Sequence, residues 1–122
     1  MEILKFIIEE SNHDAFVEVS RDYNGIHVDH GVAKEEGFEN RVVHGVHVAL
    51  RALEIVEDSR FRELKLINRL DVVFKKPVFV DEELTLNVVH NEEDQNLKIL
   101  VKVNEEDCIE MNVSLGDSML KD

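Results

Sequence analysis

An acidic residue and a histidine lie five positions apart in a short segment that contains a glycine. Asp22 and His27 belong to the stretch Ser-Arg-Asp-Tyr-Asn-Gly-Ile-His-Val-Asp, residues 20 to 29. General acid/base catalysis needs one group that accepts a proton and another that donates one, and two side chains on such a loop can reach the same water molecule. The pair alone is a weak signal, because this spacing occurs by chance in many proteins of this size.

The residues around the pair make the pattern specific. The stretch is followed by Gly37-Phe38 and then by His44-Gly45, which opens a segment with helical periodicity. This set resembles the motif of the MaoC-like hydratases, which is Ser-Gly-Asp-x-Asn-Pro-Ile-His-x-Asp, then Gly-Phe, then His-Gly. Phe16 and the run Phe-Lys-Lys-Pro-Val at 74 to 78 add to the resemblance, which covers about residues 12 to 90. The matching motif positions are Ser20, Asp22, Asn24, Ile26, His27, Asp29, Gly37, Phe38, His44 and Gly45.

The resemblance implies a role for each of the central residues. Asp22 and His27 match the catalytic pair, which holds the water that is added to, or lost from, a 3-hydroxyacyl thioester. Gly45 matches the residue whose backbone N–H stabilises the thioester oxygen as it gains enolate charge. That role suits a helix start, where the N–H groups have no intrahelical partner and lie at the positive end of the dipole. We expect Asn24 to hold the loop or the catalytic carboxylate, and His44 to support the pair from the helix start.

The second half of the chain has the alternation that is typical of strands. Apolar residues fall at every second position in four runs, which polar turns separate. This pattern predicts four strands, each with one buried face, joined into an antiparallel meander. The runs are Leu64 to Phe74, Leu84 to Val88, Leu97 to Val103 and Ile109 to Leu115.

The first half predicts one strand and the helices. Residues 3 to 8 predict a strand, and Ser11 or Asn12 can cap a short helix whose Phe16 and Val19 face inward. Residues 22 to 40 predict a loop with one short helix near 30 to 36. A longer helix is expected over residues 42 to 57, where apolar residues recur at helical spacing. Its inward face is predicted to hold Val46, Ala49, Leu50, Leu53 and Val56.

These elements predict the fold class. A sheet with one buried face needs a cover, and the helix over 42 to 57 is the only predicted element long enough to provide it. We therefore expect an α+β chain, with a single hot-dog domain over residues 1 to 122 in which a curved antiparallel sheet wraps around one central helix. The free edge of such a sheet favours pairing with a second copy, so we expect a homodimer or a higher homo-oligomer.

The charge of the chain narrows the class of ligand. The formal net charge is −13, which disfavours nucleic acid because its phosphates would be repelled. Residues 60 to 76 are an exception, with six basic residues against two acidic ones. On the residues alone, this segment is best interpreted as a solvated strand face. With the resemblance, Arg69, Lys75 and Lys76 become possible contacts for the phosphates of coenzyme A. Coenzyme A is favoured over an acyl carrier protein, which is usually acidic and would be repelled at long range.

Several other classes of protein are disfavoured. No apolar run is long enough to cross a bilayer, and the N-terminus lacks a secretory signal, so we expect a cytoplasmic protein. Cys108 is expected to be a strand residue rather than a reactive thiol. The six histidines form no convincing zinc motif and no phosphate-binding glycine loop is present, so no metal and no cofactor are predicted. His13, His30 and His90 are predicted to lie on the surface, whereas His47 either points to the pocket or caps the helix.

These observations predict an enzyme that interconverts trans-2-enoyl and (R)-3-hydroxyacyl thioesters, and two alternatives stay open. Arg21, Gly25 and Leu53 stand where the family pattern has glycine, proline and, in some members, serine. These departures are consistent with a binding or assembly subunit that has lost its activity. A thioesterase on the same fold would place a carboxylate on the central helix, and Glu54 is available for that role.

Overall fold

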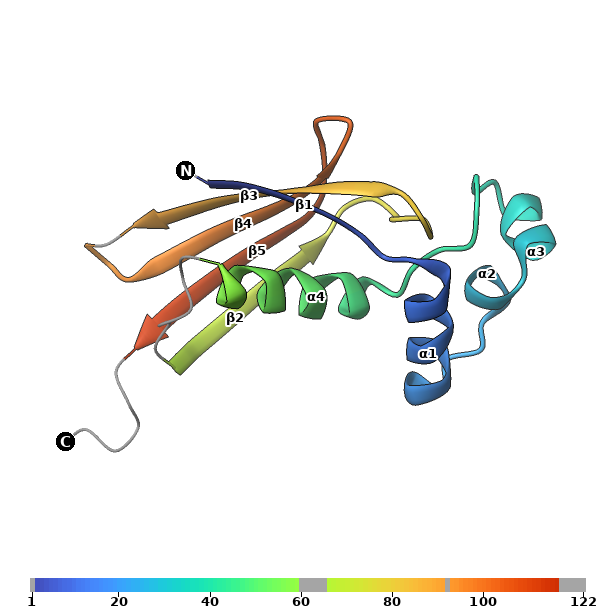
Figure 1. Ribbon diagram of the computed structural model, residues 1–122, viewed down its shortest axis with the longest axis horizontal. Helices are drawn as coiled ribbons and strands as arrows, with labels where there is room; N and C mark the ends of the chain where they lie inside the picture. The colour runs from blue at the N-terminus through green and yellow to red at the C-terminus, as the bar shows by residue number, and fades with distance from the viewer. Residues whose placement is uncertain (1, 60–65, 92, 117–122) are drawn as a thin grey trace.

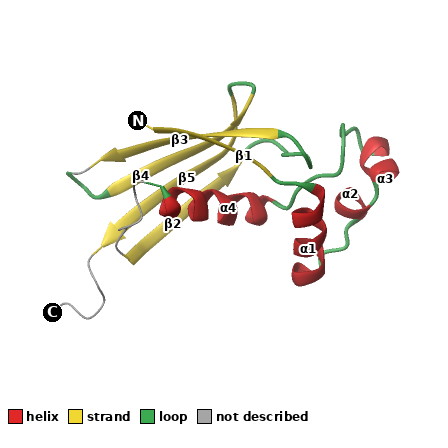
Figure 2. Ribbon diagram, in the orientation of Figure 1, coloured by secondary structure: helices red, strands yellow, loops and turns green. Residues whose placement is uncertain are grey.

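The computed structural model describes residues 2–59, 66–91 and 93–116, and Figure 1 shows how they are arranged. Within this part of the chain, five strands form one antiparallel sheet in the order β1-β3-β4-β5-β2, and the long helix α4 lies along one face of it. Figure 2 shows that the other helices lie together, beyond the N-terminal end of α4. This is the α+β hot-dog arrangement that the sequence predicts. The strands are β1 (Glu2–Ile7), β2 (Leu66–Phe74), β3 (Glu83–Asn91), β4 (Asn96–Val103) and β5 (Glu106–Gly116), and the helices are α1 (Glu10–Ser20), α2 (Gly25–Val28), α3 (His30–Glu35) and α4 (Gly45–Asp58).

The consecutive strands β3, β4 and β5 carry most of the core, with the predicted alternation. Leu84, Leu86 and Val88 of β3 have exposed fractions of 0%. Leu86 lies opposite Val101 of β4, so that both side chains point to the same buried face. Removing each such side chain from water contributes about 1.5–3 kcal/mol to folding. The remaining predicted core residues of these strands that are buried are Leu97, Ile99, Val101, Ile109, Met111, Val113 and Leu115.

The predicted meander is right for three strands and wrong for β2. β2 pairs with β5 instead of β3, and β1 takes the place beside β3. The link from β2 to β3 is therefore not a hairpin, and part of it pairs with the residues that precede α4. Val43 donates its N–H to the carbonyl of Val78 at 2.8 Å, and Val42 forms a β-bridge with Phe79. Alternation in the sequence predicts that a strand forms, but it carries no information about which neighbour the strand takes.

The predicted burial of β2 is right for Val72, which packs against the core, and wrong for two other residues. Leu70 is 40% exposed and Phe74 is 52% exposed, although both stand at the apolar positions of the alternation. β2 lies at one edge of the sheet, and neither residue belongs to the core cluster, which joins α4 to β3, β4 and β5 and to Phe6 of β1 at the other edge. Leu64, which begins the predicted run, lies outside the described residues.

Helix α4 begins later than predicted and buries a face that matches the predicted one only in part: Ala49 and Val56 are buried as predicted, and Leu53 packs against the core. It starts at Gly45 rather than at residue 42, because Val42 and Val43 are extended and pair with the link between β2 and β3. Val46 and Leu50 are more than half exposed, contrary to the prediction. The apolar residues of this helix fit more than one stripe at helical spacing. The stripe that is buried is the one that contains the alanines. The buried residues are Val48, Ala49, Ala52 and Val56.

Helix α1 also differs from its prediction. It begins at Glu10, and neither Ser11 nor Asn12 is its cap. The carboxylate of Asp81, distant in sequence, accepts the Glu10 N–H at 3.2 Å. Val19 is 81% exposed, so its predicted inward orientation is wrong. None of the helices in the described residues is long and apolar enough to span a membrane.

Candidate active site

The loop that carries Asp22 is built from side chains that bond to the backbone ahead of them. The Asp22 carboxylate accepts the N–H of Asn24 at 3.2 Å, and the Asn24 side-chain oxygen accepts the N–H of Ile26 at 3.2 Å. The second bond makes Asn24 the N-cap of α2, and Asp29 caps α3 in the same way. Asp and Asn are the residue types that favour such caps and turns. The sequence thus dictates locally that a tight loop presents Asp22 next to a very short helix that carries His27.

His27 is held with one ring nitrogen toward the protein and the other toward Asp22. Its Nδ1 lies 2.6 Å from the carbonyl oxygen of Val42. A carbonyl only accepts, so Nδ1 carries the proton and Nε2 is left with its lone pair. Nε2 lies 3.6 Å from Oδ2 of Asp22, whose side chain is 52% exposed, while the His27 side chain is 11% exposed. Two acceptors therefore face each other across a gap that one water molecule can bridge by donating a hydrogen to each.

His44 completes this cluster from the start of α4. Its ring stacks on that of His27, with centroids 3.7 Å apart and planes 21° from parallel. Its Nε2 lies 3.3 Å from the carbonyl oxygen of Asp22, to which it donates, and 3.5 Å from the Asp22 carboxylate. Burial lowers the pKa of His44, and the neighbouring His27 lowers it further. His44 is therefore neutral near pH 7, and its stacking restricts where the His27 ring can lie.

The same three residues form a possible ligand set for a metal ion. Asp22, His27 and His44 each offer one ligand atom, and these atoms lie within 4.8 Å of one another. One carboxylate and two imidazoles suit zinc. However, the Nε2 proton of His44 is donated to the Asp22 carbonyl, so only Asp22 and His27 present lone pairs to the gap in this arrangement. The absence of a metal stays a prediction.

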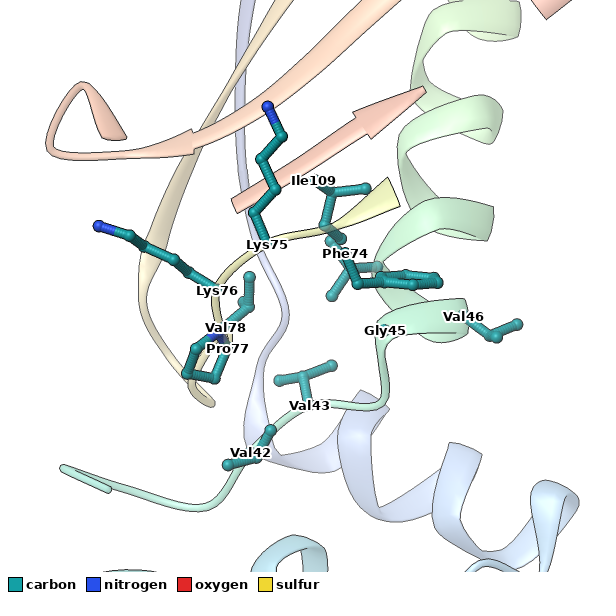
Figure 3. Close-up of a pocket in the computed structure, with 11 residues that line it drawn as sticks. Val42, Val43, Gly45, Val46, Phe74, Lys75, Lys76, Pro77, Val78 and Ile109 are labelled. Atoms are coloured by element: carbon teal, nitrogen blue, oxygen red, sulfur yellow. The ribbon is translucent and has the colours of Figure 1, made fainter. Parts of the chain in front are cut away.

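Gly45 opens α4 beside an apolar cavity of about 420 Å³, which Figure 3 shows. A Cβ atom on Gly45 would lie 2.6 Å from the ring of Phe74, so glycine is the residue that allows this ring to cover the helix start. Gly45 follows His44 directly in sequence, but Asp22, His27 and His44 are not among the residues that line this cavity. The cavity is lined by Val42, Val43, Gly45, Val46, Val48, Phe74, Lys75, Lys76, Pro77, Val78 and Ile109.

Comparison with known proteins identifies the family. A sequence model described as the MaoC-like domain matches residues 5–111. The chain belongs to the MaoC-like domain family. A mitochondrial 3-hydroxyacyl-[acyl-carrier-protein] dehydratase of Arabidopsis thaliana is 34% identical over 70 residues, which cover 57% of this chain and 41% of the relative. This MaoC-like domain therefore matches less than half the length of that curated relative.

Solved structures show the same fold. An (R)-hydratase of A. caviae that is involved in PHA biosynthesis superposes with a TM-score of 0.80 at 21% identity, covering 95% of this chain and 92% of that one. The ChsH1–ChsH2 complex of Mycobacterium tuberculosis gives a TM-score of 0.77 at 17% identity, covering 96% of this chain and 94% of the matched chain. The likeness confirms the hot-dog fold for this MaoC-like domain.

The structure shows the local surroundings of the three departures from the family motif in this MaoC-like domain. Arg21 ends α1 with φ of 58°, the left-handed conformation that glycine adopts without strain. Gly25 lies against Val32, because a Cβ at position 25 would come within 2.7 Å of that side chain. Leu53 is half-buried and packs against the hydrophobic core. None of the three substitutions separates Asp22 from His27.

The basic residues predicted to bind phosphate are only partly brought together. Lys75 and Lys76 line the cavity beside Gly45, and in Figure 3 their ammonium groups point away from Gly45. Lys76 pairs with Glu106, and the ammonium of Lys75 lies 4.0 Å from the carboxylate of Glu110. Arg69 is not among the residues that line this cavity, and it pairs with its neighbour Asp71 at 2.9 Å. Arg60, Arg62 and Lys65 lie outside the described residues.

Other predicted roles can be compared with the structure. His30 is exposed as predicted, whereas His90 is half-buried. His47 lines a second cavity, between α1 and α4, and stacks on Phe16 with ring centroids 4.4 Å apart. Burial is the main reason that the pKa of His47 is lowered to about 4. Cys108 is a buried strand residue, and burial raises the pKa of its thiol, as expected for an inert cysteine.

The prediction that His13 lies on the surface is wrong, because its exposed fraction is 0%. It lies on α1 one turn before the buried Val17, under the rings of His27 and His44. The i, i+4 spacing to Val17 was the signal in the sequence that could have found it. A histidine at such a position is easily assigned to the solvent side, because polar residues usually occupy that side.

Glu54, the carboxylate that a thioesterase would use, does not lie in the cavity beside Gly45. Its side chain is 62% exposed and accepts from Arg51 at 2.7 Å, as an ordinary pair on the surface of α4.

Proposed function

We propose that this protein is a hydratase or dehydratase that interconverts trans-2-enoyl and (R)-3-hydroxyacyl thioesters. The observation that carries the proposal is the bare Nε2 of His27, which faces the Asp22 carboxylate at 3.6 Å while its ring stacks on His44, the residue before the start of α4. The hydratases and dehydratases among the relatives support an enzyme of the lyase class.

In the proposed reaction, Asp22 and His27 hold the water that is added. His27 accepts a proton through Nε2 as the water oxygen forms a bond to C3 of the enoyl group. The electron pair of the double bond moves toward the thioester oxygen, where the N–H of Gly45 stabilises the developing charge. A proton returned by the pair forms the new C–H bond at C2. One O–H bond and the π bond between C2 and C3 break, one C–O and one C–H bond form, and the reverse order gives dehydration.

The carrier of the acyl group is proposed to be coenzyme A. A net charge of −13 disfavours an acidic carrier protein, whereas a small ligand can use the two lysines beside the cavity. We assign Lys75 and Lys76 to the phosphates of coenzyme A. Each lysine already pairs with a carboxylate, so a phosphate would have to compete with that carboxylate for it. Arg69 stays a weaker candidate because it lies off the cavity.

We propose that two copies of the chain associate through the edge strand β2. Leu70 and Phe74 on β2 are exposed, and so are Val46 and Leu50 on α4. An unpaired edge strand with exposed apolar side chains favours pairing with an identical strand in a two-fold dimer.

A single domain over residues 1 to 122 and a cytoplasmic location also stay predictions.

A decrease in absorbance at the enoyl-thioester band tests the function directly. Purified wild-type protein should hydrate at least one member of a panel of trans-2-enoyl-CoA substrates that differ in chain length. Asp22→Asn should abolish most of this activity, and His30→Gln, which removes an exposed histidine outside the cluster, should not. Equal activity of wild type and Asp22→Asn would contradict the proposal.

A binding subunit without activity is the second candidate, because Arg21 is strained next to Asp22. It predicts a measurable affinity for acyl-CoA with no turnover at any chain length. Isothermal titration with a non-reactive saturated acyl-CoA, run beside the absorbance assay, separates the two candidates.

A further inference from the structure

His13 is a buried histidine that the proposed reaction does not use. Its exposed fraction is 0%, although it stands on the short surface helix α1. A histidine in such a position needs a reason, because an apolar residue of similar size would fill the space without burying polar atoms. The reason must lie in what its two nitrogens contact.

The Nε2 atom of His13 lies 2.8 Å from the main-chain carbonyl oxygen of His27, and the bond is buried. The carbonyl only accepts, so Nε2 donates and Nδ1 keeps the lone pair. That Nδ1 is buried and has no hydrogen-bond partner among the described residues. An unpartnered buried acceptor destabilises the fold, so this orientation of the His13 ring satisfies the His27 carbonyl and leaves Nδ1 unsatisfied.

The carbonyl of His27 is a group that the local fold leaves unpaired. It lies in the last turn of α2, a helix of only four residues, where carbonyl groups have no intrahelical partner. The donor from α1 satisfies this carbonyl and ties α2 to α1. The imidazole of His27 is held separately, through its Nδ1–H, by the carbonyl of Val42. His27 is thus held at its main chain by one bond and at its side chain by another.

The ring of His13 also lies against the stacked pair. Its centroid is 5.8 Å from that of His44 and 6.5 Å from that of His27. Burial lowers the pKa of His13, against the opposing effect of its hydrogen bond to His27. A neutral His13 adds no positive charge beside the acid/base pair.

We propose that His13 is a positioning residue, which acts through the main chain of α2 to hold the His27 imidazole in place facing Asp22. As far as catalysis is concerned, this inference rests on the proposed function. The positioning itself is a property of the fold, and it can be measured without a substrate.

The test compares His13→Gln with His13→Leu. The side-chain amide of glutamine can reach the carbonyl that Nε2 of histidine reaches, whereas leucine fills the space without a donor. We expect His13→Leu to lower kcat by about 10- to 100-fold, since a misplacement of about 1 Å has effects of this size. KM should change less than twofold, and His13→Gln should restore at least half of wild-type kcat. His30→Leu, which deletes an exposed histidine, is the matched control and should keep full activity.

The second readout is the tautomer of His27, taken from the nitrogen chemical shifts of its ring. Wild type and His13→Gln should both show the Nδ1–H form, and His13→Leu should show a mixture of both forms. If His13→Leu does not fold, His13→Asn takes its place, because its shorter side chain places the amide nitrogen away from the carbonyl.

Three outcomes would overturn the proposal: wild-type kcat and tautomer in the variant without a donor, equal losses in the glutamine and leucine variants, or equal values for the glutamine and asparagine variants. If the wild-type protein hydrates no enoyl thioester, that result counts against the proposed function alone. The positioning role is then tested by the tautomer of His27, which is measured without a substrate.

Discussion

The sheet and the helical segment before α4 are stabilised in different ways. In β3, β4 and β5, many equivalent apolar side chains share one buried face, and residues such as Leu84, Leu86 and Ile99 have exposed fractions of 0%. Between α1 and α4, the geometry depends on single polar bonds, such as those from His27 to Val42 and from His13 to His27. A core of equivalent contacts tolerates small changes, whereas one lost hydrogen bond can misplace a reactive group. The two regions should therefore respond differently to mutation.

The largest expected effect is on turnover, from changes at the acid/base pair. Asp22→Asn and His27→Gln should each lower kcat by about 10²- to 10⁴-fold, because each removes one of the two groups that transfer protons. Since Asp22 is about half exposed, Asp22→Asn should leave the midpoint of thermal unfolding nearly unchanged. Steady-state kinetics and thermal denaturation on the same samples check both parts. A large loss of stability in Asp22→Asn would show that the acid/base pair contributes to the stability of the fold as well as to turnover.

The reverse result is expected from the sheet. Ile99→Ala on β4 removes a fully buried side chain and should lower the free energy of unfolding by about 2–5 kcal/mol. The kcat of the folded fraction should stay within a factor of two of wild type. Urea denaturation and kinetics at low temperature, where the variant is folded, provide the measurement. A tenfold loss of kcat in this variant would mean that the core and the site are coupled.

A smaller effect is expected from acid, through His47 between α1 and α4. Burial lowers the pKa of His47 to about 4, below the ordinary value of 6.5, so the unfolded chain binds this proton more readily than the folded one. His47 therefore contributes stability that is fully present above pH 6.5 and is lost as the pH falls toward 4. Urea denaturation at pH 7 and pH 5 should show a smaller decrease for His47→Leu than for wild type. An identical decrease in both proteins would show that His47 does not titrate in this way.

The smallest effect concerns the residue before Asp22. Arg21→Gly should raise the free energy of unfolding by about 1 kcal/mol, because the left-handed backbone at this position strains any side chain. Lys34→Gly in α3 is the matched control and should instead lower it by about 1 kcal/mol, because the backbone there is helical. Denaturant unfolding of the three proteins measures the difference. A stability gain in the control variant would contradict the explanation by backbone strain.

The sequence by itself determined most of the elements, but it did not predict α2, which lies in the segment expected to be a loop. Period-two alternation predicted β3, β4 and β5 with most of their buried residues, because each side chain's face follows from its position in a strand, whereas Val103 is only partly buried. The caps at Asn24 and Asp29 are equally local, since each side chain bonds to an N–H two or three residues ahead. The motif from Ser20 to Gly45 predicted the family, which the match over residues 5–111 confirms.

Only the tertiary structure decided what depends on contacts between distant segments. The place of β2 beside β5, the start of α4 at Gly45 and the exposed Val46 and Leu50 all follow from pairing and packing that no local pattern contains. The same holds for the site. The bonds that direct His27 come from Val42 and His13, which lie 15 residues after it and 14 before it. A hydrogen bond between distant residues leaves no periodic trace in a sequence, so only the folded chain shows the bond from His13 to His27.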